Sequence, residues 1–249
     1  MLPENENGVK KTYPDRLERP LLPNFETMRI RYRKTGNLQY ISHLDLQRTW
    51  MHVLTRAKIP MWYTQGFNPH PKLNYGCPLP VGTQSECEYL DVRIDRAIMP
   101  QEIKEQLNAE LPDEMCVLDV YPAQTTFNDI VAACYTISIH ISGATEAQAA
   151  AIDALLHGEP IMMTKKTKAG DKEINILSYV QEAGTTFRVQ DGTILLHLVL
   201  AAGNTSNLNA EMLMTAIKEK TGLLREVNTT DCYEIMREEM LCADGSAFH

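Results

Sequence analysis

The sequence predicts an α+β protein built from antiparallel sheets and a few helices. Several short segments alternate apolar and polar residues, which is the period of a half-buried strand. Other segments carry apolar residues at the spacing of one helix face. In the first half of the chain these elements follow one another in the order β-α-β-β-α-β, and this order partly recurs in the second half. The sequence therefore favours two ferredoxin-like units, each with an antiparallel sheet.

The first strand and the first helix have the clearest signals. Residues 28–34 alternate apolar and basic side chains, as a strand with one buried face does. Its outer face should present Arg29, Arg31 and Arg33. Ser42, followed three residues later by Asp45, is a capping-box pattern that predicts the start of a helix. The apolar residues at helical spacing behind it should face the core: Leu46, Trp50, Val53, Leu54 and Ala57. The exposed stripe of the same helix should be Arg48, His52 and Arg56.

The remaining elements complete the two units. In the first half we expect a helix at residues 100–111 and strands at 61–64, 73–75, 88–94 and 117–121. In the second half we expect helices at 145–156 and 209–220 and strands at 133–141, 193–200 and 232–240, while residues 174–180 fit either state. Residues 1–27, rich in proline, asparagine and charge, should form a flexible extension. The first unit should then span residues 28–124 and the second residues 131–249.

Composition and cysteine spacing narrow the class of protein. No apolar run approaches the roughly 20 residues of a membrane-spanning helix, and the first residues lack the apolar core of a signal peptide. The six cysteines include no CxxC pair, so no zinc or iron–sulfur motif is present in the sequence. We expect a cytoplasmic protein with reduced cysteines and no association with a membrane.

Charge is distributed unevenly along the chain. The whole chain carries −8, yet residues 28–75 hold eight basic residues against one acid, a charge of +7. The same segment contains both tryptophans and several tyrosines. Basic residues interleaved with aromatics can contact phosphates and stack unpaired bases, at about 1–3 kcal/mol per stacked base. The segment therefore favours a nucleic-acid-binding surface, with contacts expected from Arg29, Arg31, Arg33, Tyr63 and Phe67.

The loop at residues 65–72 is the strongest candidate for recognition. Its sequence, QGFNPHPK, places prolines on both sides of His70, which stiffens the segment and removes two backbone donors. A stiff polar loop suits recognition of a base edge or a phosphate; the structural alternative is a compact loop packed by Phe67. The residues expected to bind a substrate are Lys34, Ser42, Arg48, Arg56, Gln65, Gly66, Asn68, His70 and Lys72.

Three residues of this region are candidates for catalysis: His43, Asp45 and His70. Asp45 has a competing structural role, because an acid at this position stabilises a helix start. His43 at the first helical position could be a base, a ligand or a wall residue. Together the three could form a His-Asp-His metal site, although their spacing is typical of no known motif. Elsewhere, four lysines between Lys165 and Lys172 fit a solvated turn better than a second phosphate site, and His197 should lie in the core.

Several motifs of this region resemble the radical SAM-linked (radical SAM-associated) domain family, a bacterial family of uncharacterised function. The motifs are KTG at residues 34–36, SHLDL at 42–46 with Arg48, Arg56-Ala57, QGFNPHP at 65–71, PLPVG at 78–82 and EYLD at 88–91. The likeness is dense to Asp91 and diffuse afterwards. In the second half the family favours a D-x-R step, where this chain has Asn175 and Leu177.

The resemblance implies a partner. Proteins of that family are fused behind, or encoded beside, a radical SAM enzyme with a cobalamin-binding region, often near RNA and ribosome genes. This chain has no CxxxCxxC triplet, so the resemblance implies an accessory, substrate-handling protein rather than a complete enzyme. No cofactor is expected on this chain; S-adenosylmethionine and an iron–sulfur cluster would belong to the partner.

Three functions are compatible with these observations. The first is a non-catalytic protein that holds RNA for a radical SAM enzyme. The second is an endoribonuclease in which His43 or His70 acts as general base and Lys34 stabilises charge on the phosphate. The third is a protein-docking module that contacts a radical SAM subunit through QGFNPHP.

Overall fold

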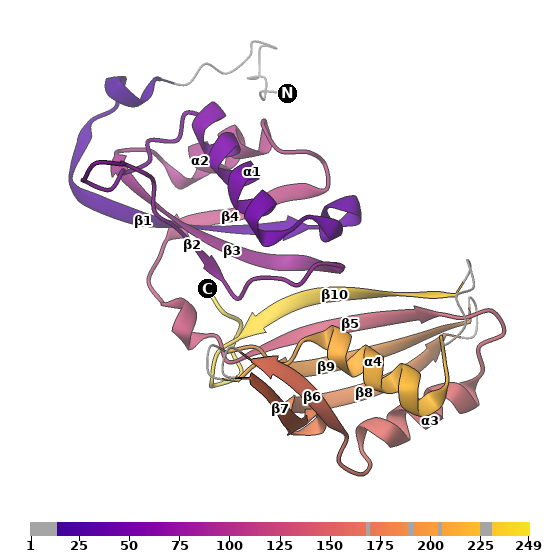
Figure 1. The fold of residues 1–249 in the computed structure, drawn as a ribbon. Helices are drawn as coiled ribbons and strands as arrows, with labels where there is room; N and C mark the ends of the chain where they lie inside the picture. Colours follow the sequence, from indigo (N-terminus) through magenta and orange to yellow (C-terminus); the bar gives the residue numbers. More distant parts are fainter. Residues whose placement is uncertain (1–13, 168–169, 189–191, 204–205, 225–230) are drawn as a thin grey trace. The chain divides into compact units, whose positions relative to one another are not determined.

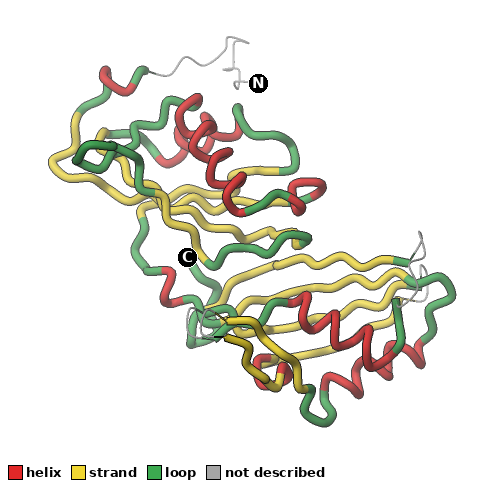
Figure 2. Tube along the Cα trace, viewed as in Figure 1, coloured by secondary structure: helices red, strands yellow, loops and turns green. Residues whose placement is uncertain are grey.

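The computed structural model describes residues 14–167, 170–188, 192–203, 206–224 and 231–249, and it confirms a mixed α+β protein with antiparallel strand pairing. The chain divides into two compact units, residues 1–127 together with His249 and residues 128–248. We describe each unit by itself. Figure 1 traces the elements along the chain, and Figure 2 separates helices, strands and loops by colour.

The first unit contains four strands and two α-helices among its described residues. They are β1 (Leu21–Lys34), α1 (His43–Arg56), β2 (Leu73–Gly76), β3 (Thr83–Arg96), α2 (Pro100–Asn108) and β4 (Met115–Pro122). The strands lie in the order β4-β1-β3-β2, and every neighbouring pair is antiparallel. Both helices lie on one face of this sheet (Figure 1).

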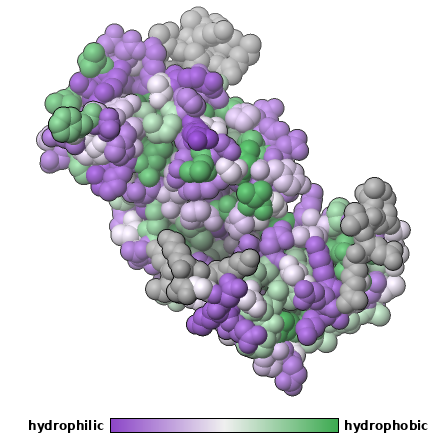
Figure 3. Space-filling view, in the orientation of Figure 1, coloured by the Kyte–Doolittle hydropathy of each residue, from purple (hydrophilic) through white to green (hydrophobic). Residues whose placement is uncertain are grey.

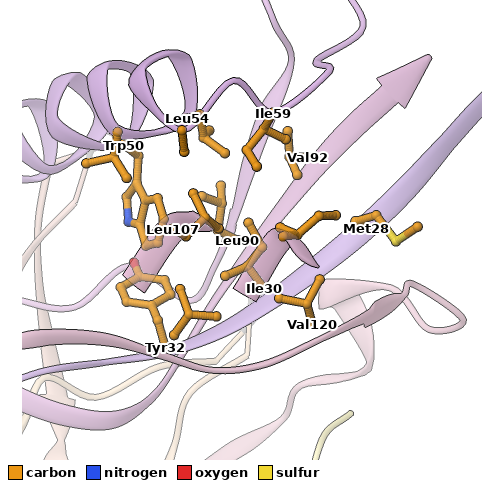
Figure 4. Close-up of a cluster of buried hydrophobic side chains, with 14 of the residues drawn as sticks. Met28, Ile30, Tyr32, Trp50, Leu54, Ile59, Leu90, Val92, Leu107 and Val120 are labelled. Carbon is orange, nitrogen blue, oxygen red and sulfur yellow. The ribbon is translucent and has the colours of Figure 1, made fainter. Parts of the chain in front are cut away.

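The core of the first unit lies between α1, α2 and the sheet. Ile30 and Tyr32 alternate with outward-facing residues along β1 and so point at the helices. The ring of Tyr32 meets Trp50 of α1 edge-on, with 4.8 Å between the ring centroids (Figure 4). Leu54, Leu90 and Leu107 pack around this pair. Rings in this geometry contribute about 0.5–1.5 kcal/mol beyond the area they bury.

Helix α1 forms as its sequence predicts. Ser42 is the N-cap, and its side chain accepts a hydrogen bond from the backbone N–H of Asp45. All five residues predicted to face the core are buried, and Arg48, His52 and Arg56 are exposed. Helix α1 therefore lies with a fixed face toward the sheet, which determines the direction of its other side chains.

The second unit repeats this strand order with one insertion. Its elements are β5 (Ala132–His140), α3 (Glu146–Leu156), β6 (Met162–Thr167), β7 (Gly170–Asn175), β8 (Val180–Arg188), β9 (Thr193–Ala201), α4 (Ala210–Thr221) and β10 (Cys232–Leu241). The strands β10-β5-β9-β8 form one antiparallel sheet, with α3 and α4 on one face (Figure 1). Strands β6 and β7 pair only with each other, as a separate hairpin. The N-cap residues of the two helices, Thr145 and Asn209, accept hydrogen bonds from backbone N–H groups of the first turns.

Four expectations from the sequence need correction. Residues 1–13 lie outside the described residues, but β1 already begins at Leu21, so residues 21–27 belong to the first unit rather than to a flexible extension. Strand β8 was not expected, because its side chains are mostly polar and half-exposed.

His197 is exposed rather than buried, since it points away from the core side of β9 and bonds Thr136. The expected lysine turn is mostly hairpin: Lys165 bonds Asn207, and Lys168 lies outside the described residues.

The surface shows no single dominant apolar area on the face drawn in Figure 3, where hydrophobic residues are interspersed with hydrophilic ones. Within the described residues, no helix has the length and apolar character to cross a membrane.

Candidate functional site

A pocket lies between α1 and β2 in the first unit. It has a volume of about 330 Å³, at the lower end of the roughly 300–1,000 Å³ that ligand pockets occupy. Its walls come from α1, from the end of the 65–72 loop and from β2. The lining residues are Gln47, Met51, His70, Pro71, Leu73 and Tyr75. Helix α1, strand β2 and the end of the loop that the sequence singled out therefore build this site together.

Helix α1 supplies one wall through a four-residue spacing. His43, Gln47 and Met51 are each four residues apart, so they lie on one side of the helix, next to the buried face. The Gln47 amide nitrogen lies 2.9 Å from His43 Nε2 and donates to it. The neutral ring of His43 then carries its proton on Nδ1. Gln47 keeps its amide oxygen, which has no partner among the described residues.

Strand β2 supplies the opposite wall. Leu73 and Tyr75 point toward the helices and pack against the core, whereas Lys72 and Asn74 are exposed on the other side. The ring of Tyr75 meets His43 edge-on, with 5.2 Å between ring centroids and an interplanar angle of 81°. The Tyr75 hydroxyl is buried without a hydrogen-bond partner in the described structure. Burial raises the pKa of this hydroxyl, so it remains a neutral O–H group at physiological pH.

The loop places His70 at the rim of the pocket. Thr64 and His70 are joined by a backbone hydrogen bond, and the Thr64 hydroxyl also accepts from the His70 N–H. His70 Nδ1 lies 3.0 Å from the carbonyl oxygen of Asn68. Because a carbonyl can only accept, Nδ1 carries a proton, and in the neutral ring Nε2 then keeps a lone pair. No described residue bonds Nε2, so His70 presents a free acceptor at the site.

The outer part of the loop is open to solvent. Gln65, Gly66, Phe67 and Asn68 are all exposed, and the Phe67 side chain is fully exposed. This rules out the compact loop packed by Phe67 that the sequence left open.

Two of the three catalytic candidates lie at this pocket, and the third does not. His70 lines it and His43 contacts two of its lining residues. Asp45 lies instead at the solvent-exposed start of α1, where it bonds Ser42 and Arg48. The hydrogen bond from Ser42, together with Arg48, lowers the pKa of the Asp45 carboxyl. Both Ser42 and Asp45 therefore serve the helix cap, and the described residues contain no group of three metal-ligating side chains.

The predicted cations do not gather on one open surface. Arg29 is fully buried and makes two hydrogen bonds to Asp91, at 2.8 and 2.9 Å, with its guanidinium against the Phe127 ring. Lys34 is also buried, and its Nζ donates to the carbonyl of Leu38. Neither side chain is exposed for contact with a phosphate in this structure, and a role of these two residues in binding stays a prediction.

The remaining cations are split between two faces. Arg31 and Arg33 alternate with the core residues of β1, so they lie on the sheet face opposite α1 and are half-buried. Arg48 and Arg56 lie on α1 and pair with Asp45 and Glu110. Arg31 and Arg33 have no ion pair among the described residues. A count of charge along residues 28–75 could not reveal this division. Glu110, which pairs with Arg56, lies outside that segment. The count also does not show that the arginines of β1 and those of α1 face opposite sides of the sheet.

The tyrosine predicted to stack on nucleic acid has a different neighbourhood. Tyr63 is half-buried, forms a bridge with Pro71 and lies under the guanidinium of Arg16 at 5.6 Å. Beside it, the Trp62 ring lies tilted against Phe25 and under the guanidinium of Arg93. A role of Tyr63 in nucleic-acid binding stays a prediction.

Sequence reasoning missed four lining residues: Gln47, Met51, Leu73 and Tyr75. One signal could have identified two of them: Gln47 and Met51 follow His43 at intervals of four residues, on one side of a helix that the sequence predicts clearly. Tyr75 gave no such signal, because its place opposite α1 depends on how β2 pairs with β3.

Comparison with known families identifies the bacterial family of this chain. Residues 27–210 match the family described as "Uncharacterized protein conserved in bacteria (DUF2344)". The match covers about three quarters of the chain, so the protein belongs to that family. No curated protein matches the chain.

Proposed function

We propose that this member of the DUF2344 family is an RNA-binding accessory protein that holds a single-stranded segment for a radical SAM enzyme. The first unit would bind the RNA, and the chemistry would take place on the partner. Support comes from the site described above and from the motifs shared with radical SAM-linked proteins. The six cysteines form no CxxxCxxC motif, so the cluster and S-adenosylmethionine would be the partner's.

The observation that carries this proposal is the fully exposed Phe67 on the loop whose end lines the pocket. The loop that bears it is stiffened by Pro69 and by the buried Pro71, so little conformational entropy is lost when a ligand binds. An exposed ring is a stacking platform for one unpaired base, and the adjacent pocket can receive another. Duplex RNA keeps its bases stacked and does not offer them to such a site.

The charges near the loop favour binding by base stacking over binding by phosphate contacts. Since Arg29 and Lys34 are buried and the α1 arginines are paired, few cations near the loop are free for phosphate. Lys72, exposed at the end of the loop, has no ion pair among the described residues. Binding should therefore depend more on stacking than on counterion release, with a shallow dependence on salt.

The strand order supports the predicted fold family. In each unit the sheet order places the first strand between the third and fourth, with both helices on one face. We propose that both units are ferredoxin-like, with the β6–β7 hairpin as an insertion in the second.

Binding can be tested directly by fluorescence anisotropy with a labelled ten-nucleotide RNA, single-stranded or annealed to its complement. We expect binding of the single strand only, weakened about tenfold by Phe67→Ala. Met99→Ala is the matched control, because Met99 is also a highly exposed apolar residue but lies at the start of α2. Equal binding of duplex and single strand, or an unaffected Phe67→Ala, would contradict the proposal.

A second function is favoured by one specific observation. The free Nε2 of His70 is suited to accept a proton, as a general base in RNA cleavage must. Incubating the protein alone with end-labelled RNA separates the two functions. Specific cleavage that disappears in His70→Ala would support an endoribonuclease, and intact RNA supports the accessory role.

The partner can be tested in the same preparation. Affinity purification from a bacterial lysate, with and without RNase, should recover a radical SAM protein in both cases if contact is direct. Recovery of that protein without any RNA, through a surface that Phe67→Ala abolishes, would favour the docking module instead.

A further inference from the structure

The two units differ in how an edge strand of each sheet is protected. In the first unit β4 is an edge strand, and side chains occupy several of its main-chain groups. The Asn108 side chain donates to the carbonyl of Val117 and accepts from its N–H. Lys104 donates to the carbonyl of Leu118. Main-chain groups that are satisfied in this way are not available for pairing with another strand.

In the second unit β8 is an edge strand, and it has no such protection in the described structure. It follows β9 at the end of the strand order (Figure 1). From residue 182 to residue 187, the main chain of β8 bonds no described residue outside β9. The segment contains no proline, and the irregularity in its pairing lies at its start, between Val180 and Glu182. A regular, unblocked edge is a template for a further strand, which is held by main-chain hydrogen bonds.

The charges of β8 indicate which strand fits this edge. Glu182 and Arg188 are exposed and have no ion pair among the described residues. Both lie on the same sheet face as His197, away from the core side. Thr185 lies midway between them in the sequence. If two copies of β8 pair antiparallel about a two-fold axis at Thr185, Glu182 of each copy therefore lies directly opposite Arg188 of the other.

The sequence of β8 favours this register over its neighbour. A two-fold axis at Gly184 would place Glu182 opposite Thr186 and would leave both charges of each strand without a partner. The axis at Thr185 instead pairs the charges, and it sets the half-buried Phe187 opposite the small Ala183 on the helix side. Opposite charges and well-fitting apolar pairs stabilise directly opposed residues, whereas like charges destabilise them.

We propose that the β8 edge is a homodimer interface, at which the β8 strands of two copies pair antiparallel about a two-fold axis at Thr185. The sheets of the two second units then form one continuous sheet, with helices α3 and α4 of both copies on the same face. This inference goes beyond the proposed function and does not depend on RNA binding.

Sedimentation velocity of the full chain, over a range of micromolar concentrations, tests the dimer. We expect a concentration-dependent species of twice the 28.2 kDa mass of one chain. Arg188→Glu and Glu182→Arg should each weaken the dimer about tenfold, because like charges then face each other at both ends of the paired strands. The double variant should dimerise like wild type, since it exchanges the two charges and keeps them complementary. Lys172→Glu, at an exposed position of β7, is the matched control and should have no effect.

Cross-linking locates the axis. Directly opposed residues of antiparallel strands have Cα atoms about 4.5–5.5 Å apart, which is within the range of a disulfide. Thr185→Cys should therefore link two copies under mild oxidation. Thr186→Cys should not, because its own counterpart is a diagonal neighbour at about 7–8 Å. Non-reducing electrophoresis measures the linked species, and wild-type protein gives the background from the six native cysteines.

Three results would overturn the inference. One is a monomer at every concentration, which would leave the proposed RNA binding untouched. Another is a dimer that neither single charge reversal weakens, although both variants have the circular dichroism of wild type. The third is cross-linking of Thr186→Cys as readily as of Thr185→Cys, which would place the axis elsewhere.

Discussion

The two units share a strand order but differ in the segment that follows their first helix. In the first unit this segment is the 65–72 loop, which carries an exposed aromatic ring, Phe67, and a histidine at the pocket, His70. In the second unit the same position holds the β6–β7 hairpin, whose Lys165 bonds Asn207. The hairpin is paired along its length, whereas only the base of the loop is paired, by Thr64 with His70 and Tyr63 with Pro71, and its tip is open to solvent. If the first unit binds RNA as we propose, this connection and not the shared sheet would carry recognition.

The largest effect should be on the stability of the first unit, through the buried ion pair in its sheet. Arg29→Ala leaves the buried Asp91 carboxylate without its partner, which typically costs about 3–5 kcal/mol. Arg31→Ala, on the same face but without an ion pair in the described structure, should cost less than about 1 kcal/mol. Urea unfolding followed by tryptophan fluorescence reports on the first unit, because both tryptophans belong to it. Equal costs for the two variants would show that the Arg29–Asp91 pair does not hold this sheet together.

The connection itself should affect binding but not stability. Phe67→Ala should lower affinity for single-stranded RNA about tenfold and leave the free energy of unfolding within about 0.5 kcal/mol. Replacing the exposed hairpin residue Met162 by alanine should leave RNA affinity unchanged. A loss of affinity in the Met162 variant comparable to that of Phe67→Ala would remove the contrast between the two units.

A substitution at the start of α1 should have a smaller effect on stability, and this effect should depend on pH. Ser42→Ala removes the N-cap and should cost about 1 kcal/mol at pH 7. The Asp45 carboxyl has a lowered pKa in the folded state, so its contribution is present above its unfolded pKa and is lost as the pH falls through the folded value, below 3.8. The stability difference between wild type and Ser42→Ala, measured by urea unfolding from pH 7 to pH 3, should therefore shrink toward acid. A difference that grows toward acid would contradict this account of the cap.

The smallest effect concerns thiol reactivity in the second unit. Burial, together with Glu239, Glu238 and Glu182, raises the pKa of the Cys134 thiol. Fewer thiolates at pH 8 should make Cys134 slower to alkylate than the exposed Cys232. Mass spectrometry of the protein at successive times of iodoacetamide treatment measures the order in which the two thiols are labelled. Faster labelling of Cys134 would show that this part of the sheet opens more readily than its burial indicates.

Local signals predicted the elements better than the site. Ser42, Asp45 and the apolar spacing behind them fix α1, because capping and amphipathicity act within a few residues. The alternation along β1 correctly placed Arg29 away from α1, but its burial depends on Asp91 and Phe127, which are distant in sequence. Tyr75 was missed for the same reason. What covers a residue, and what faces it across a pocket, is set by strand pairing that no local pattern encodes.

The most direct test of RNA binding at the open connection is photo-cross-linking of a single-stranded RNA carrying 4-thiouridine, followed by peptide mapping. We predict cross-links in residues 59–75, which contain Phe67, His70 and Tyr75. Cross-links confined to the β6–β7 hairpin, or to the β1 segment with Arg31 and Arg33, would place the RNA elsewhere and contradict the account.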